Sequence, residues 1–428
     1  MKTLIKGVTI LTMGNEEPFI GDILIERDRI ADIRPAIPAE ADVVIHSEGM
    51  AAMPGLINAH QHTPMSILRG FSDDLKLMDW LDKKMLPAEA RMTPEDIYWG
   101  AKLAMAEMIK SGTTAFADMY IHMNEIAAAI EEVGMRASLT RGLVFLEYDG
   151  GRRMSEALDL IRHWSGKAEG RITTMLGPHS PYTVPPQPFR EVIAFAEQEN
   201  IPLHTHLAET KEEVIKIRET YIQTPTEYLY HLGLFEKAHV LLAHSVHLNR
   251  RDIRYLKGMR GGVSHNPVSN LKLGCGIAPI TDMTEQGITI GLGTDGAGSA
   301  TTLDMFEEIR AATWLQKLDY GDPTKLPAMD ALRMATVGSA DLLNIGHEVG
   351  TLEIGKKADI ILIDMRKPHL QPTHNLHSLL AYSANGADVD TTIVNGKVLM
   401  QGRQLLTIDE DELLMQVSQR SNRIVKGI

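Results

Sequence analysis

The sequence predicts an α/β protein: a (β/α)8 barrel of the TIM type, with a small β-sandwich domain formed by both chain termini. The middle of the 428-residue chain alternates strand-like and helix-like hydrophobic periods. Most of the predicted barrel strands end in polar, chemically capable residues. Both ends of the chain contain only short strand-like runs, which would bury little surface alone. We therefore expect a barrel at 54–345 and a β-domain made of residues 1–53 and 346–428.

The terminal zones contain short runs of β-branched and apolar residues between turn signals. Asn395-Gly396 is a strong hairpin signal, and turns are also expected at Gly14-Asn15 and Arg27-Asp28. The predicted strands are 4–12, 22–26, 43–46, 359–364, 389–394 and 396–400.

The central zone contains eight strand-like segments, and this count fits closure into a barrel. They are 51–62, 113–119, 135–144, 172–179, 202–206, 240–244, 262–265 and 288–295. Helical periodicity appears between most of them, at 126–133, 189–198, 211–232 and 303–318.

Polar residues at the ends of these strands are the main indication of a functional site. In a parallel barrel the C-terminal ends of all strands open on one face, so residues distant in sequence converge there. The strand-end residues are His60, His62, Asp118, Arg141, His179, His206, His244, His265 and Asp295.

Composition limits the class of protein. Hydrophobic residues make up 44% of the chain, which is enough for a large core, and the net charge of −13 disfavours nucleic acid and anionic membranes as partners. No run approaches the ~18 apolar residues of a membrane helix. The single cysteine, Cys275, excludes an internal disulfide framework and a Cys-rich zinc site, so we expect a cytoplasmic protein.

Two histidine-containing motifs favour a metal site. His60 and His62 are two residues apart on a strand and therefore point to the same face, where both imidazoles can reach one ion. His204 and His206 have the same parity, so spacing alone allows either as a third ligand. Glu209, three residues beyond His206, is positioned as a carboxylate for proton transfer.

A third motif, Gly-Leu-Gly-Thr-Asp-Gly at 291–296, follows an apolar strand. Its spacing also fits a dinucleotide-binding loop, but Asp295 would oppose an anionic pyrophosphate there. We interpret Asp295 as the anionic ligand of the metal and a base for its water. His244 can contact that water, whereas His265 is better explained as structural support.

Three histidines and one aspartate around an open position would lower the pKa of a bound water towards ~7. The resulting hydroxide would attack an amide or a heteroaromatic amine. A Gly-x-Ser-x-Gly nucleophile elbow is absent where it would be needed, and one cysteine cannot form a Pro-Cys-x-x-Cys zinc deaminase site.

Four segments carry a family resemblance: 54–62, 204–210, 264–274 (Ser-His-Asn-Pro-Val-Ser-Asn-Leu-Lys-Leu-Gly) and 293–296. Together they resemble the amidohydrolase superfamily, in its cytosine/guanine deaminase-like branch. The most similar family is the 5′-methylthioadenosine/S-adenosylhomocysteine deaminases, and the resemblance covers nearly the whole chain.

The resemblance implies one divalent metal, Zn²⁺ first and Fe²⁺, Mn²⁺ or Ni²⁺ as alternatives, held by His60, His62, His206 and Asp295. It implies Glu209, His244 and Asp295 as catalytic residues, with Glu209 also contacting the purine. The remaining substrate contacts that it implies are Glu89 for the ribose hydroxyls, His179 for the ribose or base, and Arg141 with Arg153 for a carboxylate arm. Arg152 is adjacent and competes with Arg153 for this role.

The expected reaction is hydrolytic deamination at C6 of 5′-methylthioadenosine, S-adenosylhomocysteine or a related adenosine, by a metal-activated hydroxide. Alternatives are a guanine, cytosine or triazine aminohydrolase of the same superfamily, and a non-catalytic metal-binding barrel. The expected partner is a small-molecule nucleoside. A homo-oligomer is compatible with the sequence, because barrels with this accessory domain often associate.

Overall fold

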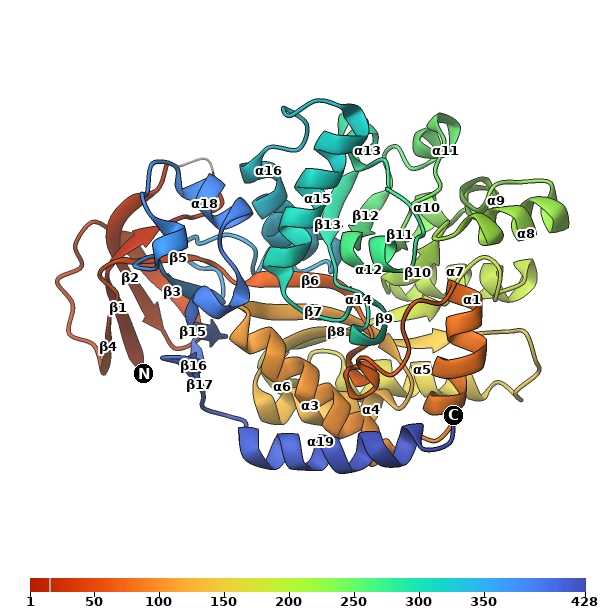
Figure 1. Ribbon diagram of the computed structural model, residues 1–428, viewed down its shortest axis with the longest axis horizontal. Coiled ribbons are helices and arrows are strands. Elements are labelled where there is room, and N and C mark those ends of the chain that lie inside the picture. Colours follow the sequence, from red (N-terminus) through yellow and green to blue (C-terminus); the bar gives the residue numbers. More distant parts are fainter. Residues whose placement is uncertain (15–16) are drawn as a thin grey trace.

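Eight parallel strands form the centre of the molecule (Figure 1). The structure is a computed structural model, and it describes residues 1–14 and 17–428. Neighbouring strands pair in sequence order from β6 to β13. The backbone N–H of Asp295, just after β13, donates to the carbonyl of His60 at 2.9 Å, so the two edges of the sheet meet. The strands are β6 (Leu56–Gln61), β7 (Thr113–Tyr120), β8 (Arg136–Leu143), β9 (Ile172–Pro178), β10 (Leu203–Leu207), β11 (His239–His244), β12 (Arg260–His265) and β13 (Thr289–Leu292).

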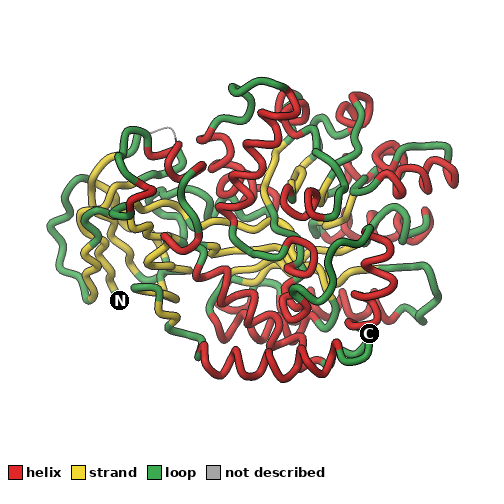
Figure 2. Tube along the Cα trace, in the orientation of Figure 1, coloured by secondary structure: helices red, strands yellow, loops and turns green. Residues whose placement is uncertain are grey.

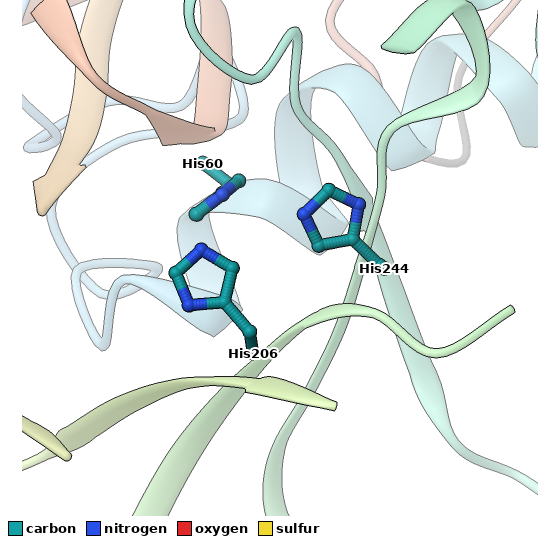
Figure 3. A group of neighbouring side chains, drawn as sticks. All are labelled: His60, His206 and His244. Atoms are coloured by element: carbon teal, nitrogen blue, oxygen red, sulfur yellow. The ribbon is translucent and has the colours of Figure 1, made fainter. Parts of the chain in front are cut away.

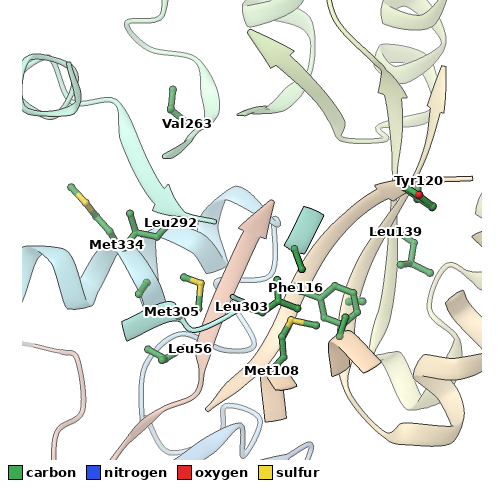
Figure 4. Close-up of a cluster of buried hydrophobic side chains, with 14 of the residues drawn as sticks. Leu56, Met108, Phe116, Tyr120, Leu139, Val263, Leu292, Leu303, Met305 and Met334 are labelled. Carbon is green, nitrogen blue, oxygen red and sulfur yellow. The ribbon is translucent and has the colours of Figure 1, made fainter. Parts of the chain in front are cut away.

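Helices surround this barrel on its outside (Figure 2). Their apolar faces pack on the strands, and the core includes Leu56, Phe116 and Leu139 (Figure 4). The longer helices are α3 (Pro94–Lys110), α4 (Met123–Val133), α5 (Arg152–Trp164), α7 (Pro186–Glu199), α8 (Lys211–Tyr221), α9 (Pro225–His231) and α15 (Met305–Tyr320). Shorter ones are α1 (Leu77–Trp80), α2 (Leu86–Glu89), α6 (Lys167–Gly170), α10 (Leu234–Lys237), α11 (Arg250–Tyr255), α12 (Pro267–Lys272), α13 (Ile280–Glu285), α14 (Ala297–Ala300), α16 (Ala328–Arg333) and α17 (Ser339–Leu342).

A nine-stranded sheet contains strands from both ends of the chain. Its core combines Ile5 and Ile23 from the first part of the chain with Ile360 and Ile393 from the last part. The strands are β1 (Lys2–Ile10), β2 (Phe19–Glu26), β3 (Arg29–Arg34), β4 (Val43–His46), β5 (Met50–Pro54), β14 (Ile360–Asp364), β15 (Val389–Val394), β16 (Lys397–Gln401) and β17 (Gln404–Leu405). The expectation of a barrel with a β-domain shared by both termini is confirmed. The turn predicted at Gly14-Asn15 includes Asn15, which lies outside the described residues.

Two segments predicted as single elements are divided. Segment 51–62 forms β5 in the terminal sheet and β6 in the barrel, and the chain changes sheets at Gly55. A Cβ at Gly55 would lie 2.1 Å from the side chain of Thr114, so only glycine fits this crossing. Segment 211–232 forms α8 and α9, because Ile222 adopts a left-handed conformation and Thr224 caps a new helix that begins with Pro225.

The last part of the chain returns to the barrel. Helix α18 (Leu376–Tyr382) packs against α16, and α19 (Glu410–Val425) lies along α3 (Figure 1). Arg420 of α19 pairs with the buried Asp96 of α3, with a separation of 3.2 Å. Region 346–428 therefore stabilises the barrel wall as well as the terminal sheet. In the described part of the chain, no helix has the length and apolar character needed to cross a membrane.

Candidate active site

Residues from four separate strands converge at the C-terminal face of the barrel. Nε2 of His62 lies 3.2 Å and Nε2 of His60 lies 3.5 Å from the same Oδ1 of Asp295. The ring centroid of His60 is 4.9 Å from that of His206 and 5.3 Å from that of His244. Figure 3 shows the His60, His206 and His244 side chains gathered around one point. The predicted convergence of β6, β10, β11 and the end of β13 is therefore present.

Hydrogen bonds at the opposite ring nitrogens orient four of these histidines. Nδ1 of His62 pairs with the carbonyl of Met119 at 2.6 Å, and Nδ1 of His206 pairs with the carbonyl of His179 at 2.8 Å. Nδ1 of His60 pairs with Nε2 of His204 at 2.8 Å, and Nδ1 of His244 with Oδ1 of Asn270 at 3.0 Å. These contacts leave each Nε2 to face the centre, which is how proteins orient imidazole ligands. His204 thus supports His60 from behind, while His206 faces the centre.

The donor set fits a divalent metal ion. Among the described residues, the buried Nε2 of His60 has no hydrogen-bond partner. Burial lowers the pKa of His60 to about 3 and that of His206 well below its ordinary value, so both imidazoles are neutral and keep a lone pair. Two groups can each hold an ion, one made of His60, His206 and His244 and the other of His60, His62 and Asp295. Neutral imidazoles with one carboxylate are ligands that zinc and related metals take.

Asp295 is fixed by its neighbours. Its Oδ2 accepts hydrogen bonds from the hydroxyls of Ser269 and Ser299, each at 2.7 Å. Burial would raise its pKa, but the neighbouring imidazoles of His60 and His62 hold that pKa well below the ordinary value. Burial likewise opposes charge on His62, yet Asp295 raises the pKa of His62 to about 9. The pair is therefore strongly attractive, and Asp295 presents an ionised oxygen at the centre.

Glu209 lies beside this cluster. Its Oε2 is 3.9 Å from Nε2 of His244, and burial raises its pKa, as suits a group that must exchange protons near neutral pH. Glu213 holds the backbone that carries it: the carboxylate of Glu213 accepts the N–H of Ala208 at 2.9 Å and of Glu209 at 3.0 Å.

A cavity of about 750 Å³ opens from the cluster. Its wall is apolar along Leu77, Trp80, Leu81 and Ile121 and charged where Arg141 and residues of α5 line it. It contains every residue predicted to contact substrate, namely Glu89, Arg141, Arg153, His179 and Glu209. Asp118 and His265, two of the strand-end residues, do not line it. Asp118 instead accepts the N–H of Thr63 at 3.2 Å.

The predicted substrate contacts have defined partners. Glu89 accepts a hydrogen bond from the Tyr120 hydroxyl at 2.5 Å, and burial raises the pKa of Glu89. Nδ1 of His179 contacts the Thr183 hydroxyl at 3.0 Å. Arg141 pairs with Glu156 at 2.7 Å, whereas Arg153 pairs with Asp149 at 3.1 Å. Arg152, the adjacent candidate, also pairs with Glu156, at 3.1 Å.

Sequence reasoning missed the residues that hold the site together: Tyr120, Glu213, Ser269, Asn270 and Ser299. A signal existed for Glu213, because Thr210 and Glu213 have the spacing of a helix-capping box. Ser269 and Asn270 lie inside the motif at 264–274, although nothing in its spacing gives them partners.

A parallel barrel with histidines, an aspartate and a glutamate at its C-terminal face is the architecture of a metal-dependent hydrolase. A family model described as Amidohydrolase family matches residues 51–399. The chain belongs to the amidohydrolase family.

Relatives in sequence and structure cover almost the whole chain. A protein of Pelotomaculum thermopropionicum named 5-methylthioadenosine/S-adenosylhomocysteine deaminase is 47% identical, over 99% of this chain and 98% of the relative. The zinc-bound structure of an adenosine deaminase from Xanthomonas campestris has a TM-score of 0.94 and 32% identity, over 99% of this chain and 98% of the other. Atrazine chlorohydrolase TrzN from Arthrobacter aurescens, also with zinc, has a TM-score of 0.91 and 25% identity, over 98% and 100%.

Proposed function

We propose that this enzyme hydrolytically deaminates C6 of adenosine-type nucleosides, with 5′-methylthioadenosine and S-adenosylhomocysteine as the first candidates. Water replaces the 6-amino group, and the products are the inosine analogue and ammonia. The observation that carries the proposal is a single cavity lined by residues of the histidine–aspartate cluster together with Glu209, Glu89 and the arginines. The names of the two deaminases that match nearly the full length of the chain support this proposal.

We assign His60, His62, His206 and Asp295 as the residues that hold one divalent ion. Zinc is the first candidate because the two structural neighbours contain it, and iron, manganese or nickel would accept the same ligands. Such an ion supplies Lewis acidity, which makes water a nucleophile near neutral pH.

The protein groups around the ion bind the substrate and move protons. Glu209 donates a proton to the purine ring nitrogen, then takes the proton of the new C6 hydroxyl and passes it to the departing amine, and its raised pKa suits these steps. The proton that Asp295 takes from the water restores the acid form of Glu209 for the next turnover. His244, whose Nε2 lies 3.9 Å from Glu209, hydrogen-bonds the attacking water. Asp295 accepts a proton from that water. Glu89 binds the ribose hydroxyls, and His179 contacts the ribose or base.

The second candidate is a triazine or bare-ring aminohydrolase, since TrzN shares the fold over the whole chain. The volume of the cavity and the presence of Glu89 favour a nucleoside with a 5′ substituent, because a bare ring would leave much of the cavity empty and has no hydroxyls for Glu89. A cytoplasmic location and association into homo-oligomers stay predictions.

The test is ammonia release from methylthioadenosine, adenosylhomocysteine, adenosine, guanine, cytosine and a triazine, with metal content measured on the same preparation. Turnover of the adenosine nucleosides by metal-loaded enzyme supports the proposal. Turnover of only guanine, cytosine or the triazine, or full activity without transition metal, contradicts it.

A further inference from the structure

The charged part of the cavity wall contains acids as well as arginines. Arg141, Arg152 and Arg153 line it together with Glu156 and Asp159. Both acids lie on α5, three residues apart, so they share one face of the helix. Asp149 neutralises Arg153 from outside the cavity lining, at 3.1 Å. Asp159 also has a partner, because Nη1 of Arg162 lies 3.1 Å from its Oδ1. Four arginines and three acids thus meet here, and each of the acids pairs with an arginine.

Glu156 is at the centre of this arrangement. Its Oε2 accepts from Nε of Arg141 at 2.7 Å, and its Oε1 contacts Nη1 of Arg152 at 3.1 Å. The side chain of Arg141 is only 8% exposed, and its Nη1 also donates to the carbonyl of Gly142 at 2.5 Å. Arg141 is therefore held on two sides, and it lines a subsite where a protein carboxylate is already present.

A purely anionic ligand group matches this subsite less well than a zwitterion does. Its carboxylate would gain the arginines but would lie beside Glu156 and Asp159, which repel it. A zwitterion, by contrast, places its carboxylate on the guanidinium groups and its ammonium on the two acids. Because each of these acids already pairs with an arginine, the subsite also accepts a neutral arm without leaving a carboxylate unpaired.

We propose that Glu156 is a specificity-determining residue that makes this subsite prefer zwitterionic 5′ arms over anionic ones. Its carboxylate receives the ammonium of an α-amino acid arm while keeping Arg141 in place for the carboxylate. This assignment rests on the proposed deamination of adenosine derivatives. It adds a residue that selects among 5′ arms, which the catalytic groups do not do.

The test compares three 5′-thioethers of adenosine that share the reacting ring. One carries a methyl group, one the homocysteine arm, and one the same arm without its amino group, so the arms are neutral, zwitterionic and anionic. The kcat/KM of each is measured for the wild-type enzyme and for Glu156→Gln. The matched control is Glu169→Gln, which removes an exposed ion pair with Lys397 outside the cavity.

In Glu156→Gln we expect the ratio of kcat/KM for the zwitterionic over the anionic arm to fall about tenfold, as for the loss of one charge-assisted contact. The methylthio substrate and the Glu169→Gln control should change little. An unchanged ratio would overturn the assignment. An equal gain in kcat/KM for both carboxylate-bearing arms would also overturn it, because Glu156 would then only compete with the ligand carboxylate for the arginines. If wild type deaminates none of the three, the proposed function itself fails; if it deaminates them and the ratio stays, only Glu156 is wrongly assigned.

Discussion

Glu213 accepts the backbone N–H of Glu209 at 3.0 Å, from the first turn of α8. Its second oxygen accepts the N–H of Ala208, whose φ of +49° lies in the left-handed region that residues other than glycine avoid. Glu213 is buried, so both bonds are protected from water. The carboxylate thus stabilises a strained turn and fixes the direction in which Glu209 leaves the end of β10.

Replacing Glu213 with Gln should lower kcat about tenfold while KM and metal content change little. The amide nitrogen would face one of the two backbone N–H groups, so one bond is lost and Glu209 moves from its position beside His244. Steady-state kinetics and metal analysis measure this. Glu212→Gln, an exposed change one residue away, is the control. A Glu213→Gln enzyme with wild-type kcat would remove Glu213 from the positioning of Glu209.

The same residue predicts a pH dependence of stability. Burial raises the pKa of Glu213 from 4.5 to about 7. Between these values the native state keeps a proton that the unfolded state has released, so the stability of the native state falls as pH rises. Glu213→Gln has no such group.

We therefore expect wild type to lose stability relative to Glu213→Gln as the pH rises. The difference between their free energies of unfolding, wild type minus variant, should fall by about 2.5 kcal/mol between pH 5 and pH 8. Urea unfolding at the two pH values measures the difference, again with Glu212→Gln as control. Parallel changes in wild type and Glu213→Gln would show that the pKa of Glu213 is not raised.

The barrel was predictable because its strands are apolar runs with polar ends, and this pattern is local in sequence. The division of segment 51–62 into two strands was not predictable, because its apolar sequence is continuous. Only the close approach of Thr114 to Gly55 marks the point where the chain passes from one sheet to the other. Likewise half of the residues of β3 are charged, namely Arg29, Asp32 and Arg34, without a regular alternation, and the strand is recognisable only by its pairing with β2.

The site was predictable where residues lie in motifs with fixed spacing, as His60, His62 and Glu209 do. Its supporting contacts join elements that the sequence separates. Tyr120 reaches Glu89 across 31 positions, and Ser269 reaches Asp295 across 26. Spacing alone could not choose between His204 and His206, and the family resemblance implied His206. The fold gives the physical reason, because it pairs His204 with His60 and places His206 at the centre.

Asp295→Asn should abolish metal binding and lower turnover by about a thousandfold or more, because it removes the carboxylate that we assign as the anionic ligand. Ser269 and Ser299 can still hydrogen-bond the amide oxygen, so the fold should persist. Metal analysis measures the loss of the ion, ammonia release measures turnover, and circular dichroism checks that the fold persists. Retained metal with normal turnover would exclude Asp295 from both roles.

Glu89→Ala should raise KM for adenosine nucleosides about a hundredfold, with much smaller effects on free bases, which have no diol. Tyr120→Phe should show the same selectivity at lower magnitude, since it removes only the 2.5 Å bond that orients Glu89. Kinetics on adenosine and on a free base turned over by wild type measure both. Equal losses for nucleoside and base would assign Glu89 to the stability of the cavity.

The buried pair of Arg136 and Asp359 joins the barrel to the terminal sheet. Nε and Nη2 of Arg136 donate to the two carboxylate oxygens at 2.8 and 3.0 Å, and the side chains are 4% and 3% exposed. Asp359 also accepts the backbone N–H of Asn395 at 2.8 Å. Because Arg136 begins β8, the pair lies at the end of the barrel opposite the catalytic cavity.

Arg136→Met should therefore destabilise the protein by about 3–5 kcal/mol, since it leaves the Asp359 carboxylate buried without its partner. Adding Asp359→Leu should recover most of this loss, and about 1 kcal/mol should remain for the unpaired N–H of Asn395. Urea unfolding of both single variants and the double variant measures the coupling, and kcat at low temperature should stay at the wild-type value. Additive losses would show that the two side chains act independently, and the terminal sheet would then be held to the barrel by apolar packing alone.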